Sequence, residues 1–358
     1  MKFGYLTGNH AEGILPGDLA RELEDRGFDS VWFPEHSHIP TERRSPYPNG
    51  GTLPASYVHM MDPWVSIAAA AERTKKLILG TGICLLLEHD LLDLACSVAT
   101  ADVLSQGRVV MGIGVGWNEE ELENHRPDLP FKKRYSAMRE RVEALRVAWQ
   151  EEQASFAGTW DNFSSSWVYP NPVNGSVPIA LGNAGPLGIQ HAAQYADEWA
   201  PIDIGVMNTD GKPDVFGGIE RFRRLADEAG RDGSSIPISL YIWGRPRLER
   251  LESYAAAGVT QFVFTPVNFD LPSADDTLRY LDELTGTVEA FRGQKPTGLP
   301  ISVSCHLKLL PPPSSLSTKS RRSFGLDTIK IPSQSPFKPS IHSGELSDSR
   351  PLIRRHED

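Results

Sequence analysis

The stretch Val109-Val110-Met111-Gly112-Ile113-Gly114-Val115 indicates most directly how this chain folds. It is apolar on both faces, as is typical of a parallel strand buried on both sides by its surroundings. Similar short apolar runs occur along the first 294 residues, and the eight runs span 3–7, 30–33, 77–83, 109–115, 178–181, 198–202, 238–243 and 262–266. The amphipathic stretches that alternate with them predict helices over 15–26, 63–73, 91–104, 131–150, 186–195, 215–229, 247–257 and 275–291.

The repetition of eight strand-helix units predicts an α/β fold, a (β/α)8 TIM barrel with an extended loop over residues 37–62 after strand 2. The alternative is a doubly wound open sheet, which often carries a Gly-x-Gly-x-x-Gly turn after its first strand. Here the first strand leads instead into Gly8-Asn9-His10. The barrel places the active site at the carboxyl ends of the strands.

The composition changes near Lys295. Residues 295–358 contain 13 Ser and 9 Pro among 64 residues, a composition typical of chains that bury no core. We therefore expect a barrel domain over residues 1–294, followed by a Ser/Pro-rich, disordered C-terminal tail.

The net charge is −10, so nucleic acid and anionic membrane surfaces are not expected as partners. Three cysteines, Cys84, Cys96 and Cys305, are too few and too scattered for a disulfide framework or a zinc site. No apolar run reaches the ~18 residues of a membrane helix, and the N-terminus lacks a signal-peptide pattern. We expect a cytoplasmic protein that acts on a small molecule.

His36 and His38 form a His-x-His pair after the second strand. In metal-dependent barrel hydrolases such a pair can hold one ion, but further ligands must come from other strand ends, where only Asp203 is suitable. We therefore predict no metal and keep a metal-dependent hydrolase as a weaker alternative. A barrel that binds a ligand without catalysis is another, and both histidines could simply be hydrogen-bonding loop residues.

Glycines interrupt two predicted strands, in Leu79-Gly80-Thr81-Gly82-Ile83 and in Met111-Gly112-Ile113-Gly114-Val115-Gly116. A glycine inside a strand marks a bulge, a barrel corner or the close approach of a ligand. The glycines of the second stretch share one face, which favours a flat ligand lying against backbone. Gly182-Asn183-Ala184-Gly185-Pro186 opens a helix whose N-terminus suits a phosphate. These features indicate a planar, phosphorylated cofactor, with His36 as the nearby proton donor.

Taken in order, these residues resemble the bacterial luciferase-like flavin and deazaflavin oxidoreductase superfamily, in particular its coenzyme F420-dependent branch. The resemblance covers residues 1–294 and rests on stretches that are weak singly and specific as an ordered set. They are Gly27-Phe28-Asp29-Ser30-Val31-Trp32 with Pro34-Glu35-His36, Leu79-Gly80-Thr81-Gly82-Ile83, Leu104-Ser105-Gln106-Gly107-Arg108, Gly112-Ile113-Gly114-Val115-Gly116-Trp117-Asn118-Glu119-Glu120, Pro178-Ile179-Ala180-Leu181-Gly182-Asn183-Ala184-Gly185-Pro186 and Tyr195-Ala196-Asp197-Glu198-Trp199.

The resemblance implies that Glu35 and His36 lie beside the reactive ring, with His36 exchanging a proton and Glu35 holding it. It also maps a non-proline cis peptide, present behind the ring in many members, to Gly82-Ile83. The implied cofactor-binding set is His36, Thr81, Gly82, Ile83, Gly114, Gly182, Asn183, Ala184 and Gly185. The chain departs from the F420-dependent sugar-phosphate dehydrogenases, which have a glutamate where it has Val115, so a different substrate is expected.

The function implied is hydride transfer between coenzyme F420 and an unidentified small organic substrate. The alternative is an FMN-dependent two-component monooxygenase, which would need a separate flavin reductase. Members are often homodimers. The residues expected to line a substrate pocket, each of which could equally pack the barrel rim, are His10, Tyr57, Trp117, Asn118 and Trp243.

Overall fold

Eight parallel strands form a nearly closed barrel in the computed structural model, which describes residues 1–208, 210–267 and 269–293. The barrel strands are β1 (Lys2–Leu6), β2 (Ser30–Phe33), β3 (Ile78–Thr81), β5 (Val109–Gly114), β8 (Ile179–Leu181), β9 (Glu198–Trp199), β10 (Ser239–Ile242) and β11 (Gln261–Phe264). Hydrogen bonding joins them in the order β10-β11-β1-β2-β3-β5-β8-β9. Parallel bridges from Trp199 to Ile238 and from Ile202 to Tyr241 close the ring. The predicted TIM barrel is confirmed.

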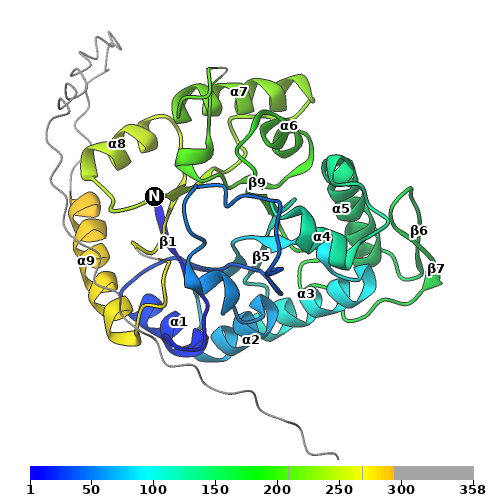
Figure 1. Ribbon diagram of the computed structural model, residues 1–358, viewed down its shortest axis with the longest axis horizontal. Helices are drawn as coiled ribbons and strands as arrows, with labels where there is room; N and C mark the ends of the chain where they lie inside the picture. Colours follow the sequence, from blue (N-terminus) through cyan, green and yellow to red (C-terminus); the bar gives the residue numbers. More distant parts are fainter. Residues whose placement is uncertain (209, 268, 294–358) are drawn as a thin grey trace, which may run out of the picture. The chain divides into compact units, whose positions relative to one another are not determined.

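Helices surround the strands on the outside (Figure 1). They are α1 (Pro16–Asp25), α2 (Pro63–Arg73), α3 (Leu91–Ser105), α4 (Glu119–His125), α5 (Arg134–Gln150), α6 (Pro186–Tyr195), α7 (Val215–Glu228), α8 (Leu248–Ala256) and α9 (Ala274–Gly293). Short 3-10 turns span Ala55–Val58, Leu86–Glu88, Phe131–Lys133 and Asp203–Gly205. The longer helices bury apolar side chains against the barrel, so the hydrophobic core forms mainly between helices and strands.

Local sequence signals explain where several helices begin. The carboxylate of Asp62 accepts a hydrogen bond from the N–H of Val65 at the start of α2, and Asp90 and Asp214 cap α3 and α7 in the same way. Such a cap satisfies an N–H that the first turn leaves without an intrahelical partner. These boundaries are therefore encoded locally, and the predicted start of each of these three helices agrees with the structure.

Three strands and one helix among the described residues were missed by the sequence prediction. Strand β4 (Cys84–Leu85) pairs with β5, and β6 (Ala154–Ala157) and β7 (Asn162–Ser166) form an antiparallel hairpin outside the barrel. The seven-residue helix α4 follows β5. All are too short for a clear hydrophobic period, because strands of two to five residues hold at most two alternations and a seven-residue helix makes only about two turns.

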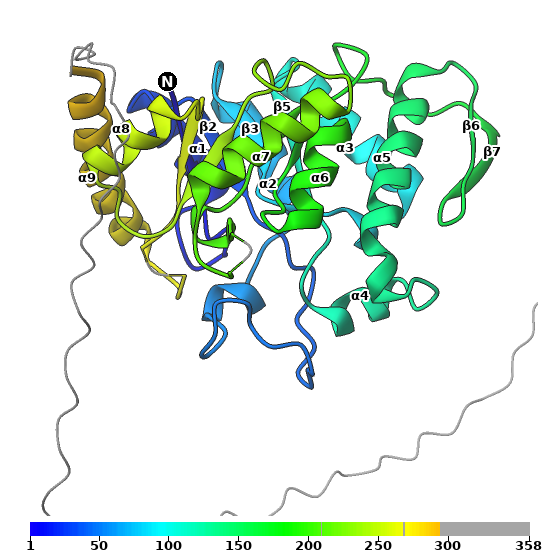
Figure 2. The same cartoon turned by 90° about the horizontal axis from the view of Figure 1, so that it is seen from above.

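Residues 37–62 lie at the carboxyl ends of the strands, at the same end of the barrel as α4 (Figure 2). The carboxylate of Glu120 accepts a hydrogen bond from the Arg44 N–H at 2.7 Å, and the Ser45 hydroxyl accepts one from the Glu119 N–H at 3.0 Å. At its other end the Met61 N–H donates to the Asn9 carbonyl at 2.8 Å. The loop is thus hydrogen-bonded to α4 near its start and to Asn9, after β1, at its end.

The expected disordered tail, and with it the boundary after residue 294, falls outside the described residues. Asn268, at the end of the eighth predicted strand, is also outside them. No helix among the described residues is long and apolar enough to span a membrane.

Candidate active site

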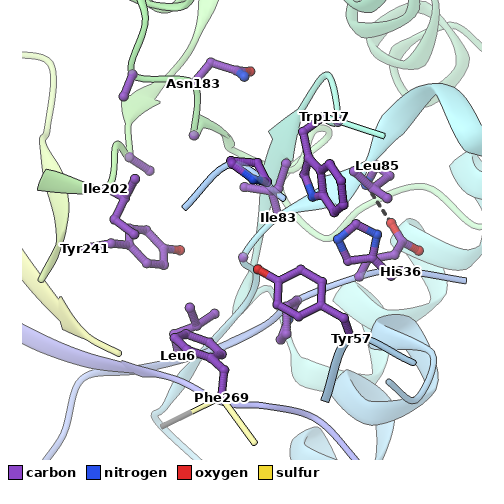
Figure 3. A pocket seen from close by; sticks show the side chains of 18 of the residues that line it. Leu6, His36, Tyr57, Ile83, Leu85, Trp117, Asn183, Ile202, Tyr241 and Phe269 are labelled. Carbon is purple, nitrogen blue, oxygen red and sulfur yellow. Dashed lines mark hydrogen bonds between the residues drawn. The ribbon is translucent and has the colours of Figure 1, made fainter. Parts of the chain in front are cut away.

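A cavity of about 360 Å³ opens at the carboxyl ends of the barrel strands, where the fold predicts the active site (Figure 3). This volume is within the range of small-molecule sites. Its lining consists of Leu6, Pro34, Glu35, His36, Pro48, Asn49, Tyr57, Met60, Gly82, Ile83, Leu85, Gly116, Trp117, Gly182, Asn183, Ala184, Ala200, Ile202, Tyr241, Trp243 and Phe269.

His36 lines this cavity three residues after β2 and is paired with a glutamate that the sequence reasoning missed. Its Nδ1 lies 2.8 Å from Oε2 and 3.0 Å from Oε1 of Glu121, whose side chain is fully buried on α4. The Nδ1–H donates to this carboxylate, so Nε2 is the ring nitrogen left for a ligand. The only sequence signal for the partner was the acidic run Glu119-Glu120-Glu121 after the fourth barrel strand.

Glu35 does not hold His36, so that expectation was wrong. Its Oε2 accepts a hydrogen bond from the Leu85 N–H at 2.6 Å, and its Oε1 lies 2.8 Å from Nε2 of His89. The physical reason is that successive side chains of an extended segment point to opposite sides. Burial disfavours the charged form of His89, but the hydrogen bond to Glu35 and the negative charges of Glu35 and Asp62 together outweigh it, so the pKa of His89 is raised.

Aromatic side chains surround His36. The ring of Tyr57 lies 5.1 Å from the imidazole between centroids, and Trp117 lies 5.9 Å from it in an edge-on arrangement. Tyr47 contacts both Tyr57 and Trp117 at 5.4 and 6.1 Å, outside the cavity lining. The cluster packs around the imidazole, and the His36 side chain is largely shielded from water.

The predicted cis peptide is present between Gly82 and Ile83. The Ile83 side chain forms part of the cavity wall and covers two glycines, because a Cβ added at Gly114 would overlap Ile83 Cδ1 and one at Gly182 would lie 2.6 Å from its Cγ2. The glycine face of β5 therefore packs against Ile83 and the Thr81 carbonyl. The sequence predicted that a flat ligand lies directly on these glycines. That prediction was wrong, because Ile83 and the Thr81 carbonyl cover them.

Three residues of the predicted cofactor set lie outside the lining. Thr81 is fully buried and its hydroxyl donates to the Gly112 carbonyl at 2.7 Å. Gly114 lies behind Ile83, and Gly185 occupies the N-cap position of α6. The structure brings the other six together, namely His36, Gly82, Ile83, Gly182, Asn183 and Ala184.

Two polar atoms at the cavity have no protein partner among the described residues. They are Oδ1 of Asn183, just before α6, and the hydroxyl of Tyr241, on β10. A buried polar atom without a hydrogen bond costs about 1–3 kcal/mol, so both atoms favour a ligand or water that bonds them. Neither the orphaned Asn183 oxygen nor the tyrosine was distinguishable from sequence.

Of the five predicted substrate residues, Tyr57, Trp117 and Trp243 line the cavity. His10 is instead buried beside Met60, with which it forms a bridge, and Asn118 is buried at the start of α4. Phe269, which sequence reasoning missed, stacks on Trp243 with centroids 5.2 Å apart and planes 13° apart. Its position after β11 was the only available signal.

A second cavity of about 270 Å³ lies beyond Glu35 and His36, and Glu88, His89 and His125 also line it. Burial, together with the carboxylates of Glu121 and Glu35, raises the pKa of Glu88 to about 9. Glu88 is therefore a neutral acid at physiological pH, and it was missed because nothing local distinguishes it.

His36 and His38 do not converge on one point. His38 Nδ1 lies 3.0 Å from the Ser37 hydroxyl, and its Nε2 lies 2.8 Å from Nδ2 of Asn124. Among the described residues, the group whose ligand atoms lie close enough together to hold a metal is Glu35, Cys84 and His89. It contains neither His36 nor His38. The geometry does not favour the metal-dependent hydrolase.

Known proteins are similar to this chain in sequence and in fold. The family described as luciferase-like monooxygenase matches residues 1–289, and the chain belongs to that family. An uncharacterized protein of Mycobacterium tuberculosis is 36% identical over 292 residues, covering 79% of this chain and 97% of the relative.

An F420-dependent glucose-6-phosphate dehydrogenase of Nakamurella multipartita is 30% identical over 242 residues, covering 64% of this chain and 65% of the relative. Among solved structures, an F420-dependent secondary alcohol dehydrogenase in complex with an F420-acetone adduct superimposes with a TM-score of 0.62 at 20% identity. The superposition covers 81% of this chain and 99% of the dehydrogenase. At this identity the likeness establishes the shared fold.

Proposed function

We propose that this protein is an F420-dependent oxidoreductase that moves a hydride between the deazaflavin and a small organic substrate. The observation that carries the proposal is the His36–Glu121 pair at the wall of a mainly apolar cavity. The named activity of the Nakamurella relative supports the choice of cofactor. A dehydrogenase and a monooxygenase are both oxidoreductases, so the relative and the family description agree on this broader class.

The cavity suits a planar group with a polar edge and a phosphate. Ile83, Leu6 and Ile202 offer apolar contact for a ring, and the unpartnered Asn183 oxygen can accept a hydrogen bond from its polar edge. The residues before α6 supply backbone N–H groups at a helix N-terminus, which favour a phosphate. Coenzyme F420, when bound, supplies a carbon that accepts or gives a hydride.

His36 is the proton carrier in this proposal. Its Nε2 takes the proton from a substrate hydroxyl as the substrate is oxidised, or returns it to a carbonyl oxygen in the reverse direction. Glu121 holds the imidazole by its Nδ1–H, and its carboxylate stabilises the positive charge that the ring acquires. General acid-base catalysis of this kind contributes about 10²–10⁴-fold. Glu35 acts through the backbone, because it fixes the Leu85 segment that forms part of the wall.

The second candidate is an FMN-dependent two-component monooxygenase, which the family description itself favours. An isoalloxazine ring makes the same kind of apolar contact, and its phosphate would use the same N-terminus of α6. The two candidates differ in their chemistry with oxygen, because the monooxygenase consumes it and needs a reductase.

An anaerobic titration of the full chain with F420 and, in parallel, with FMN tests the proposal. The readout is the change in cofactor fluorescence on binding. We expect F420 to bind at least tenfold more tightly. Tighter binding of FMN would replace the deazaflavin by the flavin in this proposal, and binding of neither would remove the cofactor site.

A further inference from the structure

The charge of the cavity lining points to a substrate class. Among the described residues, the lining contains no lysine and no arginine. Arg43 and Arg44, on the loop that covers the cavity, lie outside its lining. Arg44 is engaged by Glu120 and Glu123, and Arg250, on α8 near the rim, is engaged by Asp203. On the substrate side of the cavity, beside His36 and away from the N-terminus of α6, a phosphate or carboxylate therefore meets no lysine or arginine among the described residues.

Two carboxylates, each paired with a histidine, lie at or directly behind the cavity wall. Glu35 is in the lining, and Glu121 lies directly behind the His36 ring. Both carboxylates have side chains that are at least nine-tenths buried, so water screens them poorly. Placing like charges together at a desolvated site costs several kcal/mol, and a buried anion without a counter-ion adds its own desolvation cost. An anionic substrate is disfavoured on both grounds.

The rest of the substrate side is apolar and aromatic. Tyr57 and Trp117 form one aromatic group beside His36, and the stacked pair Trp243 and Phe269 forms another from the ends of β10 and β11. Aromatic faces bind apolar groups of substrates through dispersion and burial. The polar group placed to meet a reacting oxygen among them is the Nε2 of His36.

We propose that this cavity selects an uncharged substrate with an apolar body and one hydroxyl or carbonyl oxygen, and excludes phosphorylated and carboxylated substrates. The inference rests on the proposed function for the reaction itself. There the alcohol carbon loses a hydride to the deazaflavin, its hydroxyl proton passes to His36, and a carbonyl compound leaves. The alcohol is oxidised by two electrons and the cofactor is reduced by the same two. The selection by charge depends on the side chains of the protein and does not require the cofactor.

Two probes of matched shape test the selection without the cofactor. Acetophenone and benzoate both carry a phenyl ring with a planar carbonyl group, and they differ in charge. We expect the full chain to bind acetophenone at least tenfold more tightly than benzoate, measured by ligand-observed NMR titration. Equal affinities, tighter binding of benzoate, or binding of neither overturns the inference.

A charge variant gives the complementary test. Asn49 is exposed and lies in the lining, so Asn49→Lys adds a cation at the mouth of the cavity. We expect it to strengthen benzoate binding about tenfold and to leave acetophenone binding within twofold. The control is Thr52→Lys, which adds the same charge on the same loop at an exposed residue outside the lining and should change neither. An unchanged benzoate affinity in Asn49→Lys contradicts the inference.

The two proposals fail differently. Failure of F420 to bind the full chain removes the F420-dependent function and leaves the affinity ratio of the two probes unaffected. If F420 binds, turnover of glucose 6-phosphate at or above the rate with 1-phenylethanol overturns the charge selection and leaves the redox function standing.

Discussion

Glu121 and His36 are 85 residues apart in the sequence, yet their side chains meet at 2.8 Å in the wall of the cavity. His36 follows β2 and Glu121 lies on α4, after β5, and the barrel brings the ends of these two strands to the same rim. The pair supplies both parts of a proton carrier, a ring that faces the ligand and a buried carboxylate that orients it. This relationship is the basis of the first two predictions.

Replacing His36 by alanine removes the proton carrier and leaves the ring-contacting wall intact. We expect His36→Ala to lower kcat by about 10²–10⁴-fold and to change the dissociation constant of F420 by less than about fivefold. Steady-state kinetics and fluorescence titration measure the two separately. An unchanged rate would remove His36 from the mechanism.

Replacing Glu121 by glutamine keeps the shape and a hydrogen-bond acceptor but removes the charge. We expect Glu121→Gln to lower kcat about tenfold, which corresponds to about 1.4 kcal/mol of lost transition-state stabilisation. Cofactor affinity should stay within about twofold. A loss of cofactor affinity with an unchanged kcat would show that Glu121 acts only on the architecture of the site. Exposed Glu123, on the same helix, provides the control Glu123→Gln.

A methyl group at Gly114 would collide with Ile83 and push it into the cavity. We expect Gly114→Ala to destabilise the fold by about 1–3 kcal/mol, the usual cost of overpacking, and to weaken F420 binding. Chemical denaturation and cofactor titration measure these effects. In the control Gly286→Ala, on α9, the new methyl group meets nothing within 4 Å, so stability should be unchanged or slightly higher. Wild-type behaviour of Gly114→Ala would contradict the packing described for Ile83.

Glu88 makes stability depend on pH. Its pKa is about 9 in the folded protein, because burial and then Glu121 and Glu35 raise it from 4.5. The folded state therefore keeps a proton that the unfolded state loses between these values, so stability falls as pH rises through this range. The slope from this group alone is at most about 1.4 kcal/mol per pH unit.

Glu88→Gln removes this contribution, so its unfolding free energy should fall less steeply with pH than that of the wild type. Urea denaturation at pH 6, 7 and 8 measures the two slopes. Parallel slopes would mean that Glu88 is already ionised in the folded protein at these pH values.

The buried pair of Arg141 and Asp161 ties the segment after β4, which carries His89, to the outer hairpin. The guanidinium of Arg141 binds both oxygens of Asp161 and donates to the carbonyls of Leu86 and His89. Arg141→Ala leaves the buried Asp161 without this partner and should cost about 3–5 kcal/mol. Arg139→Ala removes an exposed arginine of the same helix and should cost less than about 1 kcal/mol. Equal losses in thermal or chemical denaturation would contradict this assignment.

Local patterns were enough to predict much of this protein. Eight apolar runs separated by amphipathic stretches predict the barrel, because helix and strand periods are properties of neighbouring residues. The position of His36 after β2 and the Gly182–Ala184 turn before α6 follow from the same local reasoning, since a barrel places its strand ends at one rim. The glycines at 112 and 114 were also recognised as unusual, although their purpose is to accommodate Thr81 and Ile83.

Only the tertiary structure decided which side chains meet at that rim. The family resemblance implied that Glu35 holds His36. In the structure the pleat of the extended chain turns Glu35 toward Leu85 and His89, and His36 pairs with Glu121 instead. Phe269 and the neutral acid Glu88 became visible for the same reason. Contacts between distant segments depend on strand register, loop path and burial, and these arise when the whole chain packs, whereas helix and strand periods are already set by adjacent residues.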